Sequence, residues 1–217
     1  PADVSLQDEI FGPLVEGIKG NTTTTTMPMR NIIKVSKRPL SDQQCFTDIF
    51  FVAGLPYLLS YFKPLDYIMM RRLASRSANT IALMIIKFIN ELQGRGFKVI
   101  EVIVDPERGM LGIQPFIADF ATTLTFVAAG EHVGPAERKG RQVKEMIRGY
   151  LSTLIFPFEF DPVLLSGLIY WCVDCINMKV TTGSLDGLSP REKVLGRRSD
   201  AHIDVVLRFG LYCQVQE

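Results

Sequence analysis

The sequence has little cysteine and no long uncharged apolar run. Its four cysteines, at positions 45, 172, 175 and 213, are too few for a disulfide scaffold in 217 residues, and this scarcity favours a reducing compartment. The longest strongly apolar stretch without charge covers residues 163–173. A membrane-spanning helix needs about 20 such residues, so we expect no membrane partner.

The chain also has almost no net charge. A formal charge of +1 excludes the uniformly basic surface that many DNA-binding domains carry. Any affinity for nucleic acid must therefore come from a local patch, and Arg and Lys cluster at residues 71–72, 138–148 and 191–198. Because the sequence begins with Pro1 rather than Met, we expect it to be a segment of a longer polyprotein.

The amount of apolar sequence is sufficient for one sizeable core. Hydrophobic residues make up 47% of the chain and charged residues 22%, which is typical of a globular α/β domain of this length. Residues 1–43 are different, because they include a run of five threonines without an apolar face to bury. We predict a lead-in or linker over residues 1–43 and a folded core over residues 44–217.

Hydrophobic periodicity predicts a mixed sheet with helices. Strands are expected at residues 45–53, 57–62, 66–70, 97–104 and 124–128, and helices at residues 75–93, 111–122, 135–154 and 162–178, with a short one after Ser189. Three strands joined by tight turns, followed by alternating helices and strands, are typical of the ribonuclease-H-like arrangement. The predicted fold class is α/β, with a five-stranded mixed sheet flanked by helices.

Three acidic residues stand where this arrangement can bring carboxylates together. Asp48 lies inside an apolar strand, Asp105 follows the fourth strand, and Glu137 lies in the first turn of the long helix. A charge within a core strand is costly unless it is paired or bound to metal. Two-metal phosphoryl transfer needs converging carboxylates, which Mg²⁺ prefers as ligands. We predict that Asp48, Asp105 and Glu137 are catalytic and bind Mg²⁺ or Mn²⁺, two ions in all.

The long helix carries basic residues beside that glutamate. Arg141, Lys144 and Arg148 share a face with Glu137, because residues three, four and seven apart meet on a helix. Such cations can bind a phosphate backbone. We predict DNA contacts at Arg138, Arg141, Lys144 and Arg148.

Several of these signals have plainer explanations. An Asp at a strand end commonly forms a turn, and a Glu in the first helical turn commonly interacts with the helix dipole. Glu107, Glu131 and Glu145 are alternative third ligands. Cys172 and Cys175 form a lone C-x-x-C within an apolar helix, which we interpret as core rather than as a metal or redox site.

The order of the motifs resembles the integrase core of Ty1/copia-type retrotransposons, a retroviral-integrase-like family of the DDE superfamily. In that family a Glu-Arg-Lys-like run opens the long helix, and an apolar helix ending in Ile-Asn, a Pro-x-Glu…Gly stretch and a Phe-Gly follow. The corresponding residues are 137–139, 176–177, 190–196 and 209–210, and the resemblance covers about residues 15–216. It places the family's catalytic acids on Asp48, Asp105 and Glu137, and its basic DNA contacts on Arg141 and Lys144.

The resemblance implies a function and a setting. A member of this family performs metal-dependent DNA 3′-end processing and strand transfer, acting on double-stranded element ends and target DNA. It is a homodimer or higher oligomer, and we expect residues 162–178 or 135–154 at the interface. Its expected location is the nucleus and a cytoplasmic virus-like particle.

The sequence departs from the family in three ways. Asp105 is followed by Pro-Glu-Arg-Gly-Met instead of x-Gly-x-Glu-Phe, its spacing of 32 residues to Glu137 is short, and the His-His-Cys-Cys zinc module is absent from the sequence. Two alternatives therefore stand beside an active integrase. One is a catalytically silent or domesticated integrase fold that binds DNA or dimerises, and the other is a different ribonuclease-H-like nuclease or transposase.

Overall fold

The computed structural model describes residues 42–106, 108–120, 122–128, 133–153, 161–181, 184 and 186–199, all within a unit spanning Lys34–Glu217. The elements in chain order are β1 (Asp42–Val52), β2 (Leu55–Lys63), β3 (Tyr67–Arg72), α3 (Ala78–Gly94), β4 (Lys98–Val104), α4 (Arg108–Leu111), α5 (Gln114–Ile117), η1 (Ala118–Phe120), β5 (Thr123–Phe126), α6 (Gly134–Thr153), α7 (Pro162–Asn177) and α8 (Pro190–Leu195). None of the helices described is long and apolar enough to cross a bilayer.

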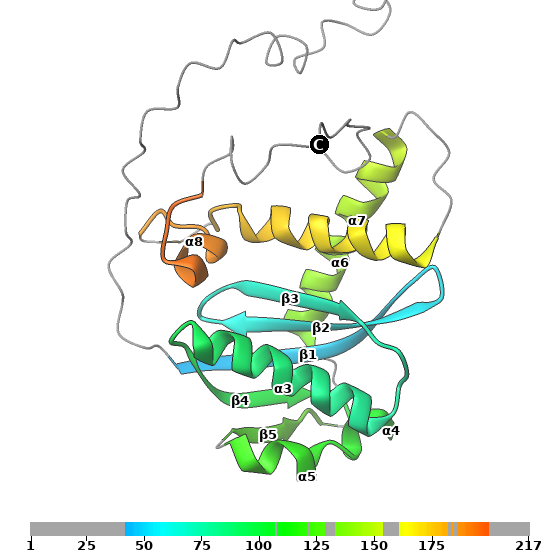
Figure 1. Ribbon diagram of the computed structural model, residues 1–217, viewed down its shortest axis with the longest axis vertical. Helices are drawn as coiled ribbons and strands as arrows, with labels where there is room; N and C mark the ends of the chain where they lie inside the picture. Colours follow the sequence, from blue (N-terminus) through cyan, green and yellow to red (C-terminus); the bar gives the residue numbers. More distant parts are fainter. Residues whose placement is uncertain are drawn as a thin grey trace, which may run out of the picture. The chain divides into compact units, whose positions relative to one another are not determined.

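The five strands form one mixed sheet (Figure 1) in the order β3-β2-β1-β4-β5. The pairs β1–β2 and β2–β3 are antiparallel, whereas β1–β4 and β4–β5 are parallel. The tight turns predicted between the first three strands account for the antiparallel pairs. The parallel pairs form because helical segments before β4 and before β5 carry the chain back to the end of the sheet at which β1 begins.

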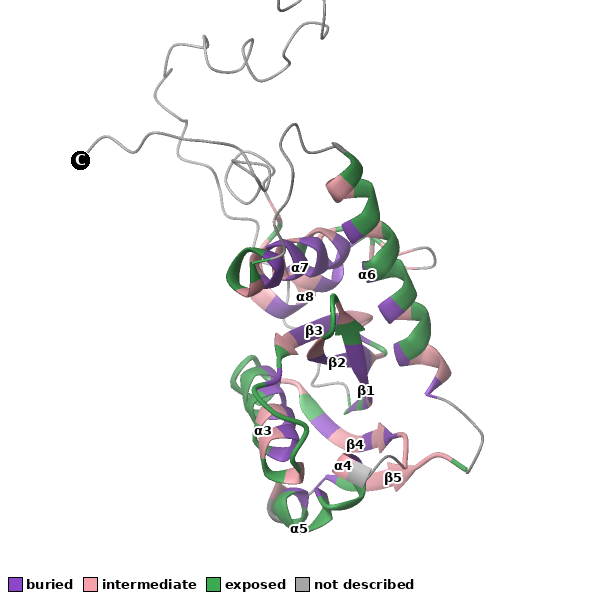
Figure 2. Ribbon diagram, turned by 90° about the vertical axis from the view of Figure 1, so that its right-hand side faces the viewer, coloured by how far each residue is buried: buried purple, intermediate pink, exposed green. Residues whose placement is uncertain are grey.

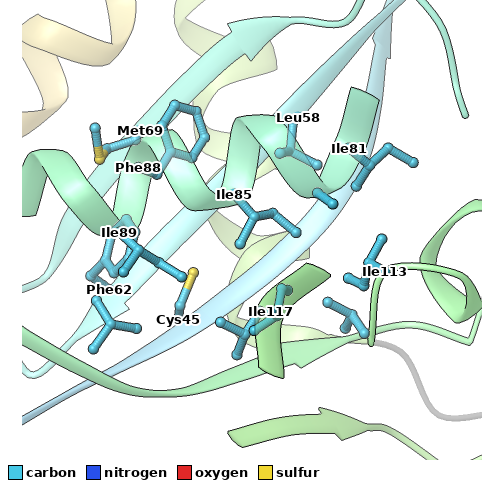
Figure 3. Close-up of a cluster of buried hydrophobic side chains, with 14 of the residues drawn as sticks. Cys45, Leu58, Phe62, Met69, Ile81, Ile85, Phe88, Ile89, Ile113 and Ile117 are labelled. Carbon is cyan, nitrogen blue, oxygen red and sulfur yellow. The ribbon is translucent and has the colours of Figure 1, made fainter. Parts of the chain in front are cut away.

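One face of the sheet is sealed by α3, α4 and α5. Odd-numbered residues of β1, including Cys45 and Ile49, point to this face and pack with Ile85 and Phe88 of α3. Figure 3 shows these apolar side chains from the sheet, α3 and α5 meeting in one cluster. Ser77 caps α3, because its hydroxyl accepts a hydrogen bond from the backbone N–H of Thr80.

The opposite face is covered in part by α6 and α7. A second apolar cluster joins Phe50 and Leu59 of the sheet to Val143 of α6 and Leu168 of α7. Figure 2 shows α6 on the side of the sheet opposite α3, with its buried residues along one side of the helix. The long helix predicted over residues 135–154 is therefore confirmed.

Helix α7 also protects the outer edge of the sheet. Asn177, at the end of α7, accepts a hydrogen bond from the backbone N–H of Ile68 at 2.9 Å and donates one to its carbonyl at 2.8 Å. The hydroxyl of Tyr170 accepts the backbone N–H of Arg72 at 3.1 Å. Strand β3 is an edge strand, and these side chains occupy backbone groups that would otherwise be open to another strand.

Two expectations about the elements need correction. The single helix predicted over residues 111–122 is instead the series α4, α5 and η1, because Pro115 begins a new helix near its N-terminus and Gly112 lies in the turn before it. Strand β1 begins at Asp42 rather than at residue 45, so it includes the last two residues of the predicted lead-in. The rest of the lead-in lies outside the described residues.

Candidate functional site

The strand register places Asp48 beside Asp105. In the parallel pair of β1 and β4, Thr47 is opposite Val104, and Asp48 and Asp105 are the next residues along the two chains. Val104 belongs to the α3-side core, and Thr47 bonds there to Ser60 at 2.9 Å. Since side chains alternate along a strand, Asp48 and Asp105 are both placed toward the α6 side.

The sheet surface around the two aspartates is polar and partly exposed. Further along the same strands, Gln44 of β1 donates a hydrogen bond to Glu101 of β4 at 2.9 Å, and the hydroxyl of Thr125 of β5 donates one to the same carboxylate at 2.6 Å. Asp48, Asp105, Glu101 and Thr125 are all half-buried. This part of the face is therefore accessible to an extended polar ligand, unlike the sealed face under α3.

Helix α6 approaches the sheet closely next to this surface. Gly140 permits the approach, since a Cβ atom there would lie 3.1 Å from ring carbons of Phe50. Glu137 is in the first turn of α6 and is exposed. A carboxylate at this position interacts favourably with the positive end of the helix dipole, so its charge is compatible with the helix whether or not it binds a metal.

The basic residues of α6 fall on two flanks of its buried side. Arg141, Lys144 and Arg148 are exposed on the flank of Glu137, and the ammonium of Lys144 lies 4.6 Å from the ring centre of Phe50 in β1. We call Glu137, Arg141, Lys144 and Arg148 the catalytic flank, after the role that the sequence predicts for Glu137.

Arg138 lies on the solvent side of α6, between the two flanks. At 100° per residue it is about 60° from Arg141 and about 40° from Gln142, and together with Lys139 and Gln142 it lines a pocket against β2. Arg138 was predicted with the DNA-contacting residues because it follows Glu137 in sequence. The helical period does not separate Arg138 from Arg141, whereas the pocket lining includes Arg138 and not Arg141 or Lys144. The same lining includes Lys139, which the sequence reasoning missed.

The carboxylates fit a hard divalent cation in kind, and two of them also fit in position. Asp48 lies on β1 and Asp105 directly follows the adjoining β4, so the two residues are near enough in the fold to be ligands of one metal site. Among the described residues, however, no three His, Cys, Asp or Glu side chains gather closely enough to hold a metal ion. Glu137 therefore stays a predicted third ligand. Of the alternatives, Glu145 is exposed further along α6, and Glu107 and Glu131 lie outside the described residues.

The cysteine pair in α7 belongs to the core. Cys172 is fully buried and Cys175 is half-buried, and burial raises the pKa of the Cys172 thiol to about 12. A thiol with so high a pKa is a poor nucleophile and a poor metal ligand at neutral pH. The interpretation as a core feature is confirmed for Cys172, whereas Cys175 is half-buried.

Comparison with known proteins supplies a structural relative. No protein-family model matches the sequence, and no curated protein matches it. Among solved structures, the catalytic core domain of BIV integrase is similar to this chain, with a TM-score of 0.54, 15% sequence identity, and coverage of 71% of this chain and 95% of that chain. The fold is therefore the ribonuclease-H-like fold of an integrase catalytic core, as predicted.

Proposed function

We propose that this protein is the catalytic core of an integrase, which processes DNA 3′ ends and transfers them into target DNA with the help of divalent cations. The observation that carries the proposal is the register of β1 and β4, which puts Asp48 and Asp105 side by side on the accessible face. An integrase-core fold supports the same conclusion. Origin in a Ty1/copia-type element is the finer part of the proposal and rests on the sequence motifs.

In this proposal each residue has a defined task. Asp48, Asp105 and Glu137 hold Mg²⁺ or Mn²⁺, with two ions expected. When bound, the ions supply charge stabilisation for in-line displacement at phosphorus. The paired strands hold both aspartates rigidly, and Arg141 and Lys144 bind phosphates so that the reacting end stays in register.

The two steps follow the same displacement chemistry. In end processing, water attacks a phosphodiester near the end of the element, and a free 3′-OH is left. In strand transfer, that 3′-OH attacks a phosphodiester of the target and displaces the target's own 3′ oxygen. Each step exchanges one P–O bond for another.

The experiment that tests the proposal measures metal binding and strand transfer together. Duplex DNA with a recessed 3′ end is incubated with supercoiled plasmid and Mg²⁺ or Mn²⁺, and calorimetry measures Mn²⁺ binding without DNA. We expect Asp105→Asn and Asp48→Asn to lower both Mn²⁺ affinity and joining at least about a hundredfold, because each removes a charged ligand while keeping the side-chain shape.

A matched control uses the same chemical change on the same strand. Asp42→Asn alters an exposed residue at the start of β1, and it should leave both readouts unchanged. For Asp105→Asn we expect folding to be preserved, and thermal stability without metal can even rise because two neighbouring carboxylates repel each other. Joining at the wild-type level by Asp105→Asn would exclude the catalytic role of that residue.

A catalytically silent integrase fold is the second candidate. It is favoured by one observation, the absence of a three-acid group among the described residues. This candidate predicts DNA binding without metal-dependent cleavage in the wild-type protein. A nuclease of the same fold predicts cleavage without joining of 3′ ends, so the products of the plasmid assay separate an integrase from a silent fold and from a nuclease.

The proposal extends to assembly and setting. Helix α7 presents Val163 and Leu164 to solvent, and they are 75% and 52% exposed. Apolar surface of this kind is typical of subunit contacts, which favours a homodimer or a higher homo-oligomer. Sedimentation at high protein concentration tests this assembly. An integrase would act in the nucleus after release from a longer polyprotein in a virus-like particle.

A further inference from the structure

A cationic pocket lies on the flank of α6 that faces away from the catalytic flank. It has a volume of about 350 Å³ and is lined by residues of α6 and of the end of β2, namely Tyr61, Lys63, Pro135, Arg138, Lys139 and Gln142. We call these six residues the β2–α6 pocket. Its volume is within the usual range of ligand sites, roughly 300–1,000 Å³.

The pocket carries more positive charge than its neighbours neutralise. Lys139 is paired with Asp66 at 2.9 Å. Lys63 and Arg138 have no carboxylate partner within the described part of the chain. The contact found for Arg138 is to the backbone carbonyl of Gly134, at 3.3 Å. The positive charges of Lys63 and Arg138 are therefore available to interact with a bound anion.

The walls of the pocket are held in place before any ligand arrives. Asp66 accepts hydrogen bonds from the hydroxyl of Tyr61 and from Lys139 through the same oxygen. Burial, and then the hydrogen bond to Asp66, raise the pKa of Tyr61, so its hydroxyl stays protonated as a donor. The ring of Tyr61 also lies near the ammonium groups of Lys63, at 5.9 Å, and Lys139, at 4.9 Å.

These features select the chemistry of the ligand. Cations already occupy positions over the Tyr61 ring, so stacking of a nucleobase on that ring is disfavoured. The polar groups without carboxylate partners are the donors of Lys63 and Arg138, and Arg with Lys is the pair that proteins use to bind phosphate. An uncharged or cationic ligand would leave the two surplus charges unbalanced.

We propose that the β2–α6 pocket binds a phosphate group of a nucleic-acid strand that passes on the side of α6 away from Glu137. This inference rests on the proposed function, since it presumes that the protein binds DNA. It adds a second phosphate site, with Lys63 and Arg138 as its ligands, to the contacts of the catalytic flank. Helix α6 then lies between two nucleic-acid strands, or between two segments of one nucleic-acid strand.

The test compares two double substitutions that each remove two charges. Lys63→Gln with Arg138→Gln changes the pocket. Lys87→Gln with Arg95→Gln changes two exposed cations across the sheet, one in α3 and one at its C-cap. Binding of a fluorescent DNA duplex is measured without divalent metal across a salt titration. We expect the pocket variant to bind about tenfold more weakly and its salt slope to fall by about 1, because the pocket holds one phosphate group and each phosphate contact contributes about 0.9.

A second arm uses inorganic tripolyphosphate as the probe in calorimetry. Loss of tripolyphosphate binding in the pocket variant together with weaker DNA binding supports a strand phosphate. If the pocket variant loses tripolyphosphate binding but keeps its DNA affinity, the pocket does not bind a nucleic-acid phosphate. Its ligand is then a free phosphate compound. Unchanged binding of both probes overturns the site altogether, and thermal melting confirms that the variants are folded.

The plasmid joining assay separates this inference from the proposed function. If wild-type protein joins DNA ends while the pocket variant binds DNA normally, the pocket inference fails and the integrase proposal stands. If wild-type protein joins no ends but the pocket variant loses DNA affinity, the integrase proposal fails and the pocket inference stands.

Discussion

The two faces of the sheet differ in how completely they are buried and in the polarity of their side chains. On the α3 face, the odd-numbered residues of β1 meet a helix whose inner side is fully buried, and the contacts are almost all apolar. On the α6 face, the even-numbered residues include Phe50, packed under Gly140, and also Asp48, which is left half-buried. The strand period of two therefore gives β1 one side that packs in the sealed core and another side that carries a half-buried carboxylate.

This division has a consequence for substitutions. A change on the α3 face should alter the free energy of unfolding and leave ligand binding to the folded protein unchanged. A change on the catalytic flank should weaken ligand binding and leave the free energy of unfolding unchanged. The edge of β3, where α7 bonds to the backbone, belongs with the first group because its polar contacts are buried.

The largest effect is expected from Phe88→Ala. The Phe88 side chain is 1% exposed in the α3-side core, and removal of a buried aromatic ring typically costs about 3–5 kcal/mol of unfolding free energy. Urea denaturation measures this cost. Leu83→Ala is the control on the same helix, since Leu83 is 57% exposed, and it should change stability by less than about 0.5 kcal/mol.

The Phe88 experiment also tests the comparison of the faces. At a temperature where Phe88→Ala is still folded, it should bind duplex DNA as tightly as the wild type. Weaker DNA binding by the folded variant would show that the α3 face is not a purely structural surface.

The second effect concerns the edge of the sheet. Asn177→Ala removes a side chain that bonds to both the N–H and the carbonyl of Ile68. Two buried backbone groups lose their partner, and we expect a loss of about 2–3 kcal/mol of unfolding free energy. Asn90→Ala is the control, because Asn90 is exposed on α3 and alanine favours the helix.

Exposure of the β3 edge should have a second consequence for Asn177→Ala. An unprotected edge strand can pair with another chain, so light scattering at high concentration should show more association than for the wild type. A variant as stable as the wild type would mean that the hydrogen bonds of Asn177 contribute nothing net to the edge.

Much of the fold was predictable because it depends on local periods. The first strand and the long helix are properties of single segments, and both predictions are confirmed by β1 and α6. The short helix expected after Ser189 is also present, and the Ser189 hydroxyl caps it by accepting a hydrogen bond from the N–H of Glu192. Local signals of this kind need no knowledge of distant residues.

The candidate site was less predictable because it depends on contacts between distant segments. Placing Asp105 beside Asp48 required the strand order, which the sequence indicated only by its resemblance to a known topology. The partnership of Lys139 with Asp66 joins a helix to a turn about seventy residues earlier. Nothing in either segment alone predicts it.

The smallest effect, and the sharpest test of the comparison, is expected from Arg141→Glu with Lys144→Glu. Both residues are exposed, so the free energy of unfolding should change by less than about 0.5 kcal/mol. On the catalytic flank, charge reversal replaces attraction to phosphate with repulsion. We expect DNA affinity to fall at least about tenfold, which corresponds to about 1.4 kcal/mol, and raised salt to weaken the wild type in the same direction.

The control and the metal readout decide what the loss means. Lys87→Glu with Arg95→Glu makes the same change of charge on the sealed side of the sheet, and it should lower DNA affinity much less. Mn²⁺ affinity of the catalytic-flank variant should persist, because Asp48, Asp105 and Glu137 are intact. If both double variants weaken DNA binding equally, long-range charge rather than a located contact is responsible. The two faces would then not differ in DNA contact, and the integrase proposal would lose the support of its basic helix.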